Sequence, residues 1–266
     1  MALSLENKVA LITGASNGIG EATARLFAAN GARVVLTDLN EERGQKVSSE
    51  LPGAKFRRVD VRREVDLAEA VDFAVNTFGQ LDIMVNNAGL IGAMGSIAQL
   101  SGENWRATMS ILLDGVFYGT KHAARVMVPR RSGRILTTAS TAGIAGGLGA
   151  HAYTAAKHGV VGLMKSAAAE LSIHGITVNA VAPGSTVTAL AVKFLGSVEA
   201  ANELCAKESS LGTAIQSEDI ANGFLYLAAD TGRSITGQTI MIDGGAMNLG
   251  RGSGRIFYGD VNQYAD

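Results

Sequence analysis

Short apolar runs alternate with amphipathic stretches along most of the chain. Residues 8–13 form an apolar, β-branched-rich run that stops at Gly14, and a second run covers 33–38. Runs of this kind, without alternating polar positions, are typical of strands buried on both faces of a sheet. Between them, residues 21–29 have the composition of a helix, and Asn30-Gly31 follows as its C-cap. The start of the chain therefore predicts a strand, a glycine turn, a helix and a second strand.

The same alternation continues along the rest of the chain, and no linker-like stretch divides it. Parallel strands that alternate with helices form doubly wound sheets with helices on both faces. We therefore predict a single α/β domain over residues 1–250, followed by a tail over 251–266 that is either flexible or an inter-subunit arm. The seven expected strands are 8–13, 33–38, 54–61, 81–85, 133–139, 176–182 and 238–243, and the six expected helices are 21–29, 40–50, 64–78, 102–128, 150–169 and 218–229.

Two of the expected helices show an apolar face near a period of 3.6 residues. In the helix 102–128 this face is expected to lie inward or at an interface between subunits. The apolar positions are Val65, Ala68, Val71, Ala74, Val75 and Phe78 in helix 64–78, and Trp105, Met109, Leu112, Leu113 and Phe117 in helix 102–128.

Composition and charge narrow the possible functions. Apolar residues make up 47% of the chain and charged residues 18%, which is ample for a full core. The net charge is −1 with the two signs interspersed, so we expect neither nucleic acid nor a membrane as a partner. Cys205 is the single cysteine, no Cys/His spacing matches a zinc site, and residues 1–8 lack a secretory pattern. We therefore expect a cytoplasmic protein without a metal site.

The turn after the first strand reads Gly14-Ala-Ser-Asn-Gly18-Ile-Gly20. Glycines permit close backbone approach, and the free N–H groups at the helix start attract a pyrophosphate. The spacing differs from Gly-x-Gly-x-x-Gly, and the turn alone equally suits an ordinary strand-to-helix connection. Asp38 ends the next strand, where dinucleotide folds place a carboxylate on the adenosine ribose. Because Leu39 and Asn40 follow it rather than a basic residue, we expect NAD rather than NADP. The alternative is that Asp38 merely caps the next helix.

A candidate acid/base pair lies in the second half of the chain. Tyr153 and Lys157 are one helical turn apart, so their side chains share a face of the expected helix. A nearby positive charge lowers the pKa of a phenol toward neutrality, which suits proton transfer to or from an alcohol oxygen. Tyr/Lys pairs at this spacing are common in proteins, so the pair gains weight only from its context, which includes Ser140 at the end of a strand.

Four motifs follow one another in a fixed order: Thr13-Gly14-x3-Gly18-x-Gly20, Asn86-Asn87-Ala88-Gly89, Ser140 and Tyr153-x3-Lys157. Together they closely resemble the short-chain dehydrogenase/reductase family, over roughly residues 5–247. The resemblance implies a Rossmann-type fold and hydride transfer between NAD(H) and a secondary alcohol or ketone. It implies Tyr153 as the general acid/base and Ser140 as a hydrogen-bond partner of the substrate oxygen. Lys157 would lower the pKa of the tyrosine and hold the nicotinamide ribose.

The resemblance also implies a set of residues that contact the cofactor. In the family, the segment around Pro183-Gly184 holds the nicotinamide carboxamide, and the residues after the second, third and fourth strands line the adenosine half. The expected contacts are Gly14, Ser16, Asn17, Gly18, Ile19, Gly20, Asp38, Asp60, Val61, Asn86, Ala88, Gly89, Tyr153, Lys157, Pro183, Gly184, Thr186 and Thr188.

One position departs from the family pattern. Members carry an Asn-x-x-Gly-x-Phe motif whose asparagine belongs to the proton relay, and Leu112 stands at that position here. Leucine cannot form the hydrogen bonds of an asparagine side chain. A backbone carbonyl can still hold a relay water if the helix is kinked there, and Ser110 or Asp114 can compensate. An alternative function is therefore a dinucleotide-binding sensor or scaffold with little turnover.

The segment 188–217 is the least regular part of the second half, and the resemblance identifies it as the substrate lid. Its apolar residues Leu190, Phe194 and Leu195, together with Met94 and the loop 144–148, suggest a hydrophobic pocket. An amphipathic helix explains these residues almost as well. We expect a bulky or cyclic secondary alcohol, or its ketone, as the substrate. The family resemblance and the apolar helix surfaces imply a homo-oligomer, either a tetramer or a dimer.

Overall fold

A computed structural model describes residues 3–247 of the chain. Its centre is a seven-stranded sheet in the order β3-β2-β1-β4-β5-β6-β9, in which every neighbouring pair is parallel. This arrangement confirms the predicted fold class. The strands are β1 (Val9–Thr13), β2 (Arg33–Asp38), β3 (Lys55–Arg58), β4 (Ile83–Asn86), β5 (Gly133–Thr138), β6 (Ile176–Pro183) and β9 (Thr239–Ile242).

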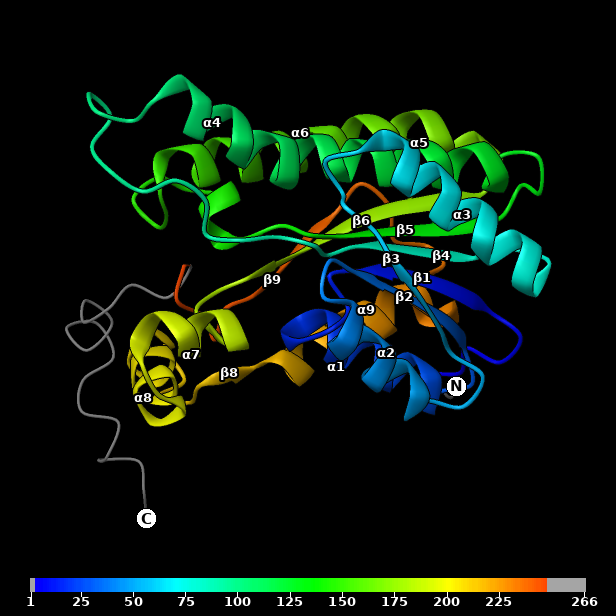
Figure 1. Cartoon of the computed structure of the whole chain (residues 1–266), viewed down its shortest axis with the longest axis horizontal. Helices are drawn as coiled ribbons and strands as arrows, with labels where there is room; N and C mark the ends of the chain where they lie inside the picture. The colour runs from blue at the N-terminus through cyan, green and yellow to red at the C-terminus, as the bar shows by residue number, and fades with distance from the viewer. Residues whose placement is uncertain (1–2, 248–266) are drawn as a thin grey trace, which may run out of the picture.

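Helices cover both faces of the sheet (Figure 1). One layer contains α1 (Gly18–Ala29), α2 (Glu41–Ser49) and α9 (Ser217–Ala228), and the other contains α3 (Glu64–Phe78), α4 (Gly102–Met109), α5 (Gly115–Met127) and α6 (His151–Leu171). Each layer encloses its own hydrophobic cluster against the sheet. All five residues of β1 and all eight of β6 are buried, as expected for strands covered on both sides.

The strand order reverses beside β1, which lies between β2 and β4. At such a switch point the loops after neighbouring strands turn to opposite faces of the sheet and leave a crevice at the carboxyl ends. The glycine turn after β1, Asp38 at the end of β2 and Asn87 after β4 all lie at this edge. The topology therefore brings together motifs that are far apart in the sequence.

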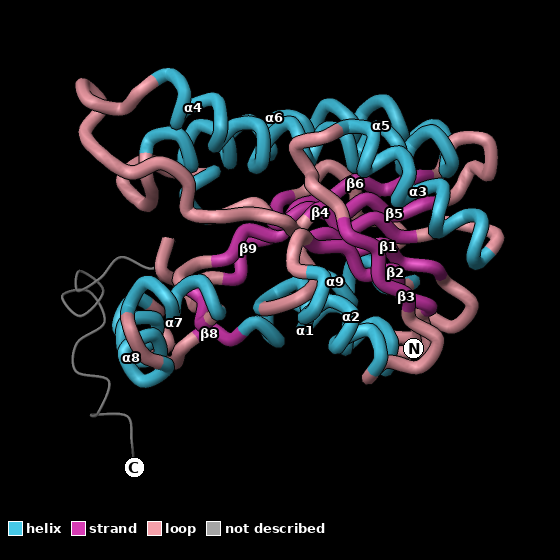
Figure 2. Tube along the Cα trace, in the orientation of Figure 1, coloured by secondary structure: helices cyan, strands magenta, loops and turns pink. Residues whose placement is uncertain are grey.

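The segment 184–216 forms a separate structure beside this edge. It contains α7 (Ala189–Leu195), α8 (Val198–Glu208) and a small parallel pair of strands, β7 (Thr186–Val187) and β8 (Ile215–Gln216). Figure 2 shows α7 and α8 next to β8, apart from the helices that cover the sheet. The sequence analysis did not foresee β7 and β8, and the expected domain end at residue 250 and the tail 251–266 lie outside the described residues.

The helix expected over 102–128 is interrupted. A π-helical segment, Ser110–Asp114, separates α4 from α5. The backbone hydrogen bonds there span one residue more than in an α-helix. The expected strand 54–61 is also shorter. Its pairing ends at Arg58, and the N–H of Asp60 donates to Asp66 Oδ2 at 3.0 Å, which turns the chain toward α3.

The apolar face of α3 differs from the predicted one, and one apolar residue of α5 is exposed. In α3, Leu67, Ala70, Val71 and Ala74 are buried against the sheet, whereas Val65 is 51% exposed. Phe117 on α5 is 45% exposed. α3 has apolar residues on more than one side, so the periodicity alone did not select the side that packs. Within residues 3–247, no helix combines the length and hydropathy that crossing a membrane requires.

Candidate active site

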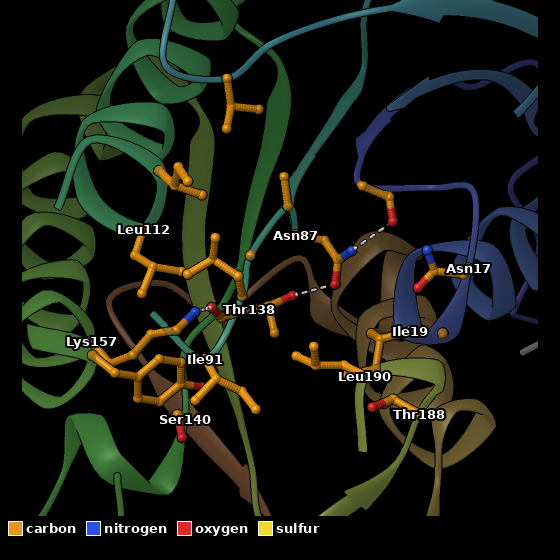
Figure 3. A pocket seen from close by; sticks show the side chains of 18 of the residues that line it. Asn17, Ile19, Asn87, Ile91, Leu112, Thr138, Ser140, Lys157, Thr188 and Leu190 are labelled. Atoms are coloured by element: carbon orange, nitrogen blue, oxygen red, sulfur yellow. Dashed lines mark hydrogen bonds between the residues drawn. The ribbon is translucent and has the colours of Figure 1, made fainter. Parts of the chain in front are cut away.

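A cavity of about 750 Å³ opens at the carboxyl edge of the sheet. In Figure 3, Asn17, Ile19 and Thr188 lie on one side of it, Lys157 and Ser140 on the other, and Asn87 and Thr138 between them. Most residues expected from the sequence line this cavity: Gly14, Asn17, Gly18, Ile19, Asp38, Asp60, Val61, Ala88, Gly89, Ser140, Tyr153, Lys157, Gly184 and Thr188.

The glycine turn owes its shape to glycine at specific positions. Gly14 and Gly18 have φ values of +63° and +54°, which favour glycine. A Cβ on Gly14 would lie 2.8 Å from Ala88 Cα, and one on Gly20 would lie 2.1 Å from the Gly14 carbonyl oxygen. Larger residues at these positions would therefore push the turn away from the loop after β4.

Asp38 connects the glycine turn to the end of β2. Its Oδ2 accepts from the Ser16 N–H at 3.1 Å and its Oδ1 from the Asn40 N–H at 3.0 Å. The cap of α2 is Asn40, whose side chain accepts from the Arg43 N–H, so Asp38 is not the helix cap considered above. Its carboxylate lines the cavity instead, in the position that suits ribose hydroxyls.

Asp60 and Arg62, which both line the cavity, form a close ion pair. Arg62 Nε lies 2.9 Å from Asp60 Oδ1 and 3.0 Å from Asp60 Oδ2, and hydrogen bonding by Arg62 lowers the pKa of Asp60. Asp60 is therefore ionised and fixed in orientation. Val61 beside it supplies an apolar surface to the same part of the cavity.

Helix α6 and the end of β5 bring the three candidate catalytic residues into the cavity. Lys157 Nζ lies 5.6 Å from the centre of the Tyr153 ring and donates to the Thr138 carbonyl at 2.6 Å. Ser140 begins a short 3₁₀ turn, and its Oγ accepts from the Ala142 N–H at 3.1 Å. A hydrogen bond also links Ser140 to Tyr153. The predicted triad thus forms one cluster.

Burial dominates the electrostatics of the pair. It lowers the pKa of Lys157 to about 8, because a buried ammonium loses its hydration. Burial also raises the pKa of Tyr153, and the hydrogen bond from Ser140 opposes this shift without reversing it. The sequence analysis expected Lys157 to lower the pKa of the tyrosine. The net shift is in the opposite direction, because loss of solvent around the phenol outweighs the hydrogen bond from Ser140.

Asn87, which the sequence analysis did not place among the site residues, links the two halves of the cavity. Its Nδ2 donates to the carbonyls of Thr13 and Gly14 at 3.0 and 3.2 Å, and its Oδ1 accepts from Thr138 Oγ1 at 2.9 Å (Figure 3). Since the Thr138 carbonyl accepts from Lys157, one network runs from the glycine turn to the ammonium group.

Five of the expected cofactor residues do not line the cavity: Ser16, Gly20, Asn86, Pro183 and Thr186. Asn86 Nδ2 donates to Thr120 Oγ1 at 3.3 Å, so this side chain is directed toward α5. Thr186 Oγ1 donates to the Gly184 carbonyl at 2.9 Å and thereby shapes the loop that does reach the cavity. Their direct contacts with a cofactor stay predictions.

The other end of the cavity is apolar. Its walls come from the loop after β4, the π-helical segment, the loop before α6, and α7. The apolar side chains are Leu90, Ile91, Ile111, Leu112, Leu148, Leu190 and Phe194. Leu112 is 1% exposed. Within the described chain, Arg62 and Lys157 are the only cationic residues that line the cavity. This end therefore suits an uncharged, apolar ligand.

Comparisons with known proteins agree with this geometry. A family model described as enoyl-(acyl carrier protein) reductase matches residues 14–247. Momilactone A synthase of Oryza sativa subsp. japonica is 44% identical, with 92% of this chain and 91% of that protein covered. Xanthoxin dehydrogenase of Arabidopsis thaliana is 43% identical, with 91% and 90% covered. (+)-Borneol dehydrogenase 2 of Salvia officinalis is 42% identical, with 91% and 90% covered.

The fold matches a solved structure equally well. Levodione reductase superposes with a TM-score of 0.84 at 31% sequence identity, over 90% of this chain and 97% of that one. These relatives are named for oxidoreductase or synthase activities, so they give no support to the alternative of a sensor or scaffold.

Proposed function

Because the chain belongs to the short-chain dehydrogenase/reductase family, we propose that it transfers a hydride between NAD(H) and a bulky or cyclic secondary alcohol, or the corresponding ketone. The observation that carries this proposal is the cluster of Ser140, Tyr153 and Lys157 in a cavity whose outer end is apolar. The cluster supplies proton transfer, and the apolar walls supply a place for the carbon skeleton.

The other end of the cavity fits a dinucleotide. Side chains on Gly14 or Gly20 would collide with backbone atoms, so the turn presents bare backbone at the N-terminal end of α1, where a pyrophosphate binds well. Asp38 would hold the adenosine ribose, and the Gly184 and Thr188 segment would hold the nicotinamide end. The absence of a basic residue directly after Asp38 supports NAD over NADP. When bound, the nicotinamide supplies or accepts the hydride.

The chain's own residues move the proton. In the direction of alcohol oxidation, the ionised Tyr153 oxygen accepts the hydroxyl proton, and the Ser140 hydroxyl donates a hydrogen bond to the substrate oxygen. Lys157, fixed by the Thr138 carbonyl, would hold the ribose of the cofactor, and its positive charge would favour the ionised tyrosine. In ketone reduction, Tyr153 returns its proton to the oxygen.

The apolar end supports a bulky or cyclic substrate. Leu190 and Phe194 of α7 face Ile91 and Leu112 across the cavity, and no cation lies among the described residues of this wall. Relatives at 42–43% identity are named as dehydrogenases of borneol and xanthoxin. We therefore propose apolar alcohols as the substrate class of this chain. The panel described below identifies the individual compound.

The decisive test incubates the purified protein with NAD and a panel of cyclic and acyclic secondary alcohols. Absorbance of reduced nicotinamide should grow with at least one of them, and Tyr153→Phe should lower the rate by at least about 10²-fold, because general acid/base catalysis contributes on the order of 10²–10⁴. Tyr226→Phe is the matched control, since Tyr226 is 43% exposed on α9 and does not line the cavity. Cofactor binding without turnover across the panel would instead favour the sensor.

Cytoplasmic location and a homo-oligomer complete the proposal. The single cysteine supports the location, and fractionation of cells that express the protein tests it. The exposed Phe117 on α5 supports self-association, which sedimentation of the purified protein measures. We propose the domain extent of 1–250 as well.

A further inference from the structure

A second depression, of about 440 Å³, lies between α1 and α2 beside the glycine turn. Acidic and basic side chains make up most of its lining. Its lining residues are Glu21, Arg25, Asn40, Glu42, Arg43, Lys46, Val47 and Glu50. The sequence analysis considered only the two residues after Asp38 as possible contacts of a 2′-phosphate, whereas the fold brings a more distant arginine to the same place.

That arginine is Arg43, in the first turn of α2. Its Nε donates to the Ser16 carbonyl at 2.6 Å, and the N–H of the same Ser16 donates to Asp38 Oδ2 at 3.1 Å. One residue of the glycine turn, Ser16, therefore contacts both the guanidinium of Arg43 and the carboxylate expected to hold the ribose. No other basic side chain within the described residues is hydrogen-bonded to this turn.

Glu21 fixes the direction of this guanidinium. Arg43 Nη2 lies 3.2 Å from Glu21 Oε2 on α1. The side chain of Arg43 is 51% exposed, whereas that of Glu21 is 19% exposed, so the arginine is the more mobile partner. Arg43 is exposed, so its guanidinium can reach a stronger acceptor, but it must first give up its contact with Glu21. A phosphate group is such an acceptor, because it binds a guanidinium through two parallel hydrogen bonds.

We propose that Arg43 is a latent binding residue for the 2′-phosphate of a nucleotide, and that Glu21 acts with Asp38 to keep it unused. Asp38 repels the phosphate directly. Glu21 is a positioning residue, because it holds the guanidinium against the glycine turn and neutralises its charge. Cofactor choice in this chain thus depends on a second acid, on a different helix from the first. This inference rests on the proposed dinucleotide site.

The depression provides a matched control for the charge of Glu21. Arg25 pairs with Glu21 at 2.8 Å and with Glu50 at 2.6 Å. Glu50 therefore lies in the same cluster, carries the same charge and contacts the same Arg25, but it has no contact with Arg43 among the described ion pairs. Replacing either acid with glutamine changes the net charge equally, so any difference between the two variants reports on Arg43.

The test measures binding of 2′,5′-ADP and ADP, which need no turnover and no nicotinamide. In an Asp38→Ser background, adding Glu21→Gln should strengthen 2′,5′-ADP binding by about tenfold, the size of one good charge-assisted hydrogen bond. Adding Glu50→Gln instead should strengthen it by less than about twofold, because only a screened long-range charge changes. Introducing Arg43→Ala together with Glu21→Gln should remove the gain. ADP binding should respond alike to the two glutamine variants.

Two results would overturn the proposal: equal gains from Glu21→Gln and Glu50→Gln, or a gain that persists without Arg43. Circular dichroism and ADP binding show whether each variant is folded, and Asp38→Asn, which retains an acceptor for the Ser16 N–H, is the second background if Asp38→Ser is unstable. The unsubstituted protein tests the proposed function separately. If it binds neither ADP nor NADH, the dinucleotide site itself is absent, whereas tighter NADPH than NADH binding would contradict both the NAD preference and the proposal that Arg43 is kept unused.

Discussion

Lys157 occupies an environment that disfavours its own charge. The residue is 4% exposed, and its hydrogen-bonded partner is the neutral carbonyl of Thr138 rather than a carboxylate. Burial lowers the pKa of Lys157 to about 8. A buried, strained charge of this kind is typical of a functional group, because a residue selected only for stability would be apolar here.

The first prediction concerns the pH dependence of stability. Between pH 8 and about 10.5, the unfolded chain keeps the Lys157 proton while the folded chain has lost it, so the free energy of unfolding rises with pH in this window. The destabilisation is complete below pH 8 and absent above about 10.5. Lys157→Met should lack this rise. The stability of the unsubstituted protein relative to the variant should therefore increase by about 3 kcal/mol across the window.

Urea unfolding of both proteins at several pH values measures this difference. Comparing pH profiles removes a constant contribution from the Thr138 carbonyl, which loses its donor in the variant at every pH. Lys165→Met on the exposed side of the same helix is the control and should follow the unsubstituted profile. Parallel profiles for Lys157→Met and the unsubstituted protein would show that the lysine titrates normally in the folded state.

For single residues, the sequence predicted which side chains form the site, but it did not predict how buried those side chains are. The helical spacing of Tyr153 and Lys157 sufficed to place them on one face, because that relation is local. Burial of the phenol, which reverses the expected direction of its pKa, depends on residues distant in the chain. Asn87 was left out of the expected site residues for a similar reason. It follows Asn86 directly, and only the orientation at the strand end decides that one amide faces α5 and the next faces the glycine turn.

Among the elements, the π-helical segment Ser110–Asp114 has the clearest functional consequence. It contains no glycine or proline, and its apolar pattern continues through both neighbouring helices, so the sequence predicted an uninterrupted helix. π-Helical turns often occur at functional sites. Here the turn carries Leu112 into the cavity, at the position where the family resemblance led us to expect a relay asparagine.

The second prediction is that Leu112→Asn raises turnover and leaves NADH affinity unchanged. An amide at this position restores a polar group to the apolar wall, which can hold a relay water near Lys157. We expect a rise of up to about tenfold, within the range that proton transfer contributes. The variant should also be less stable by about 2–4 kcal/mol, because a leucine that is 1% exposed becomes polar.

Steady-state kinetics and NADH fluorescence titration test this prediction, with circular dichroism to verify folding. Leu113→Asn is the control: it makes the same change in the same π-helical segment, but Leu113 packs near Gly159 and does not line the cavity. A folded Leu112→Asn variant whose turnover falls would mean that the leucine is required for substrate packing rather than being a defect in the relay.

For the whole molecule, a parallel sheet was predictable because strands alternate with helices along the chain, and each of its seven strands overlaps a range expected from the sequence. The segment 184–216 was less predictable. β7 and β8 contain two residues each and are separated by α7 and α8, so no local pattern reveals their pairing. The same is true of Arg43, whose contact with Ser16 spans 27 positions in the sequence. Sequence patterns thus located the cavity but not the contacts that tune it.

The apolar end of the cavity lies apart from the end where the dinucleotide is expected. The last prediction follows from this separation. Phe194 and Leu190 line only the lid side, since α7 packs beside the sheet edge and away from β2 and β3, where the adenosine half is expected (Figure 1). Phe194→Ala should therefore lower kcat/KM for the bulkiest alcohols by about 10–200-fold, the equivalent of roughly 1–3 kcal/mol of lost apolar contact, and leave NADH affinity unchanged. The loss should be smaller for smaller alcohols, because a small alcohol does not reach α7. Val198→Ala on α8 is the control, as that side chain is 51% exposed and outside the cavity. Kinetics over a size series of secondary alcohols measures the trend, and an equal loss for small and large alcohols would assign Phe194 to lid stability instead of substrate contact.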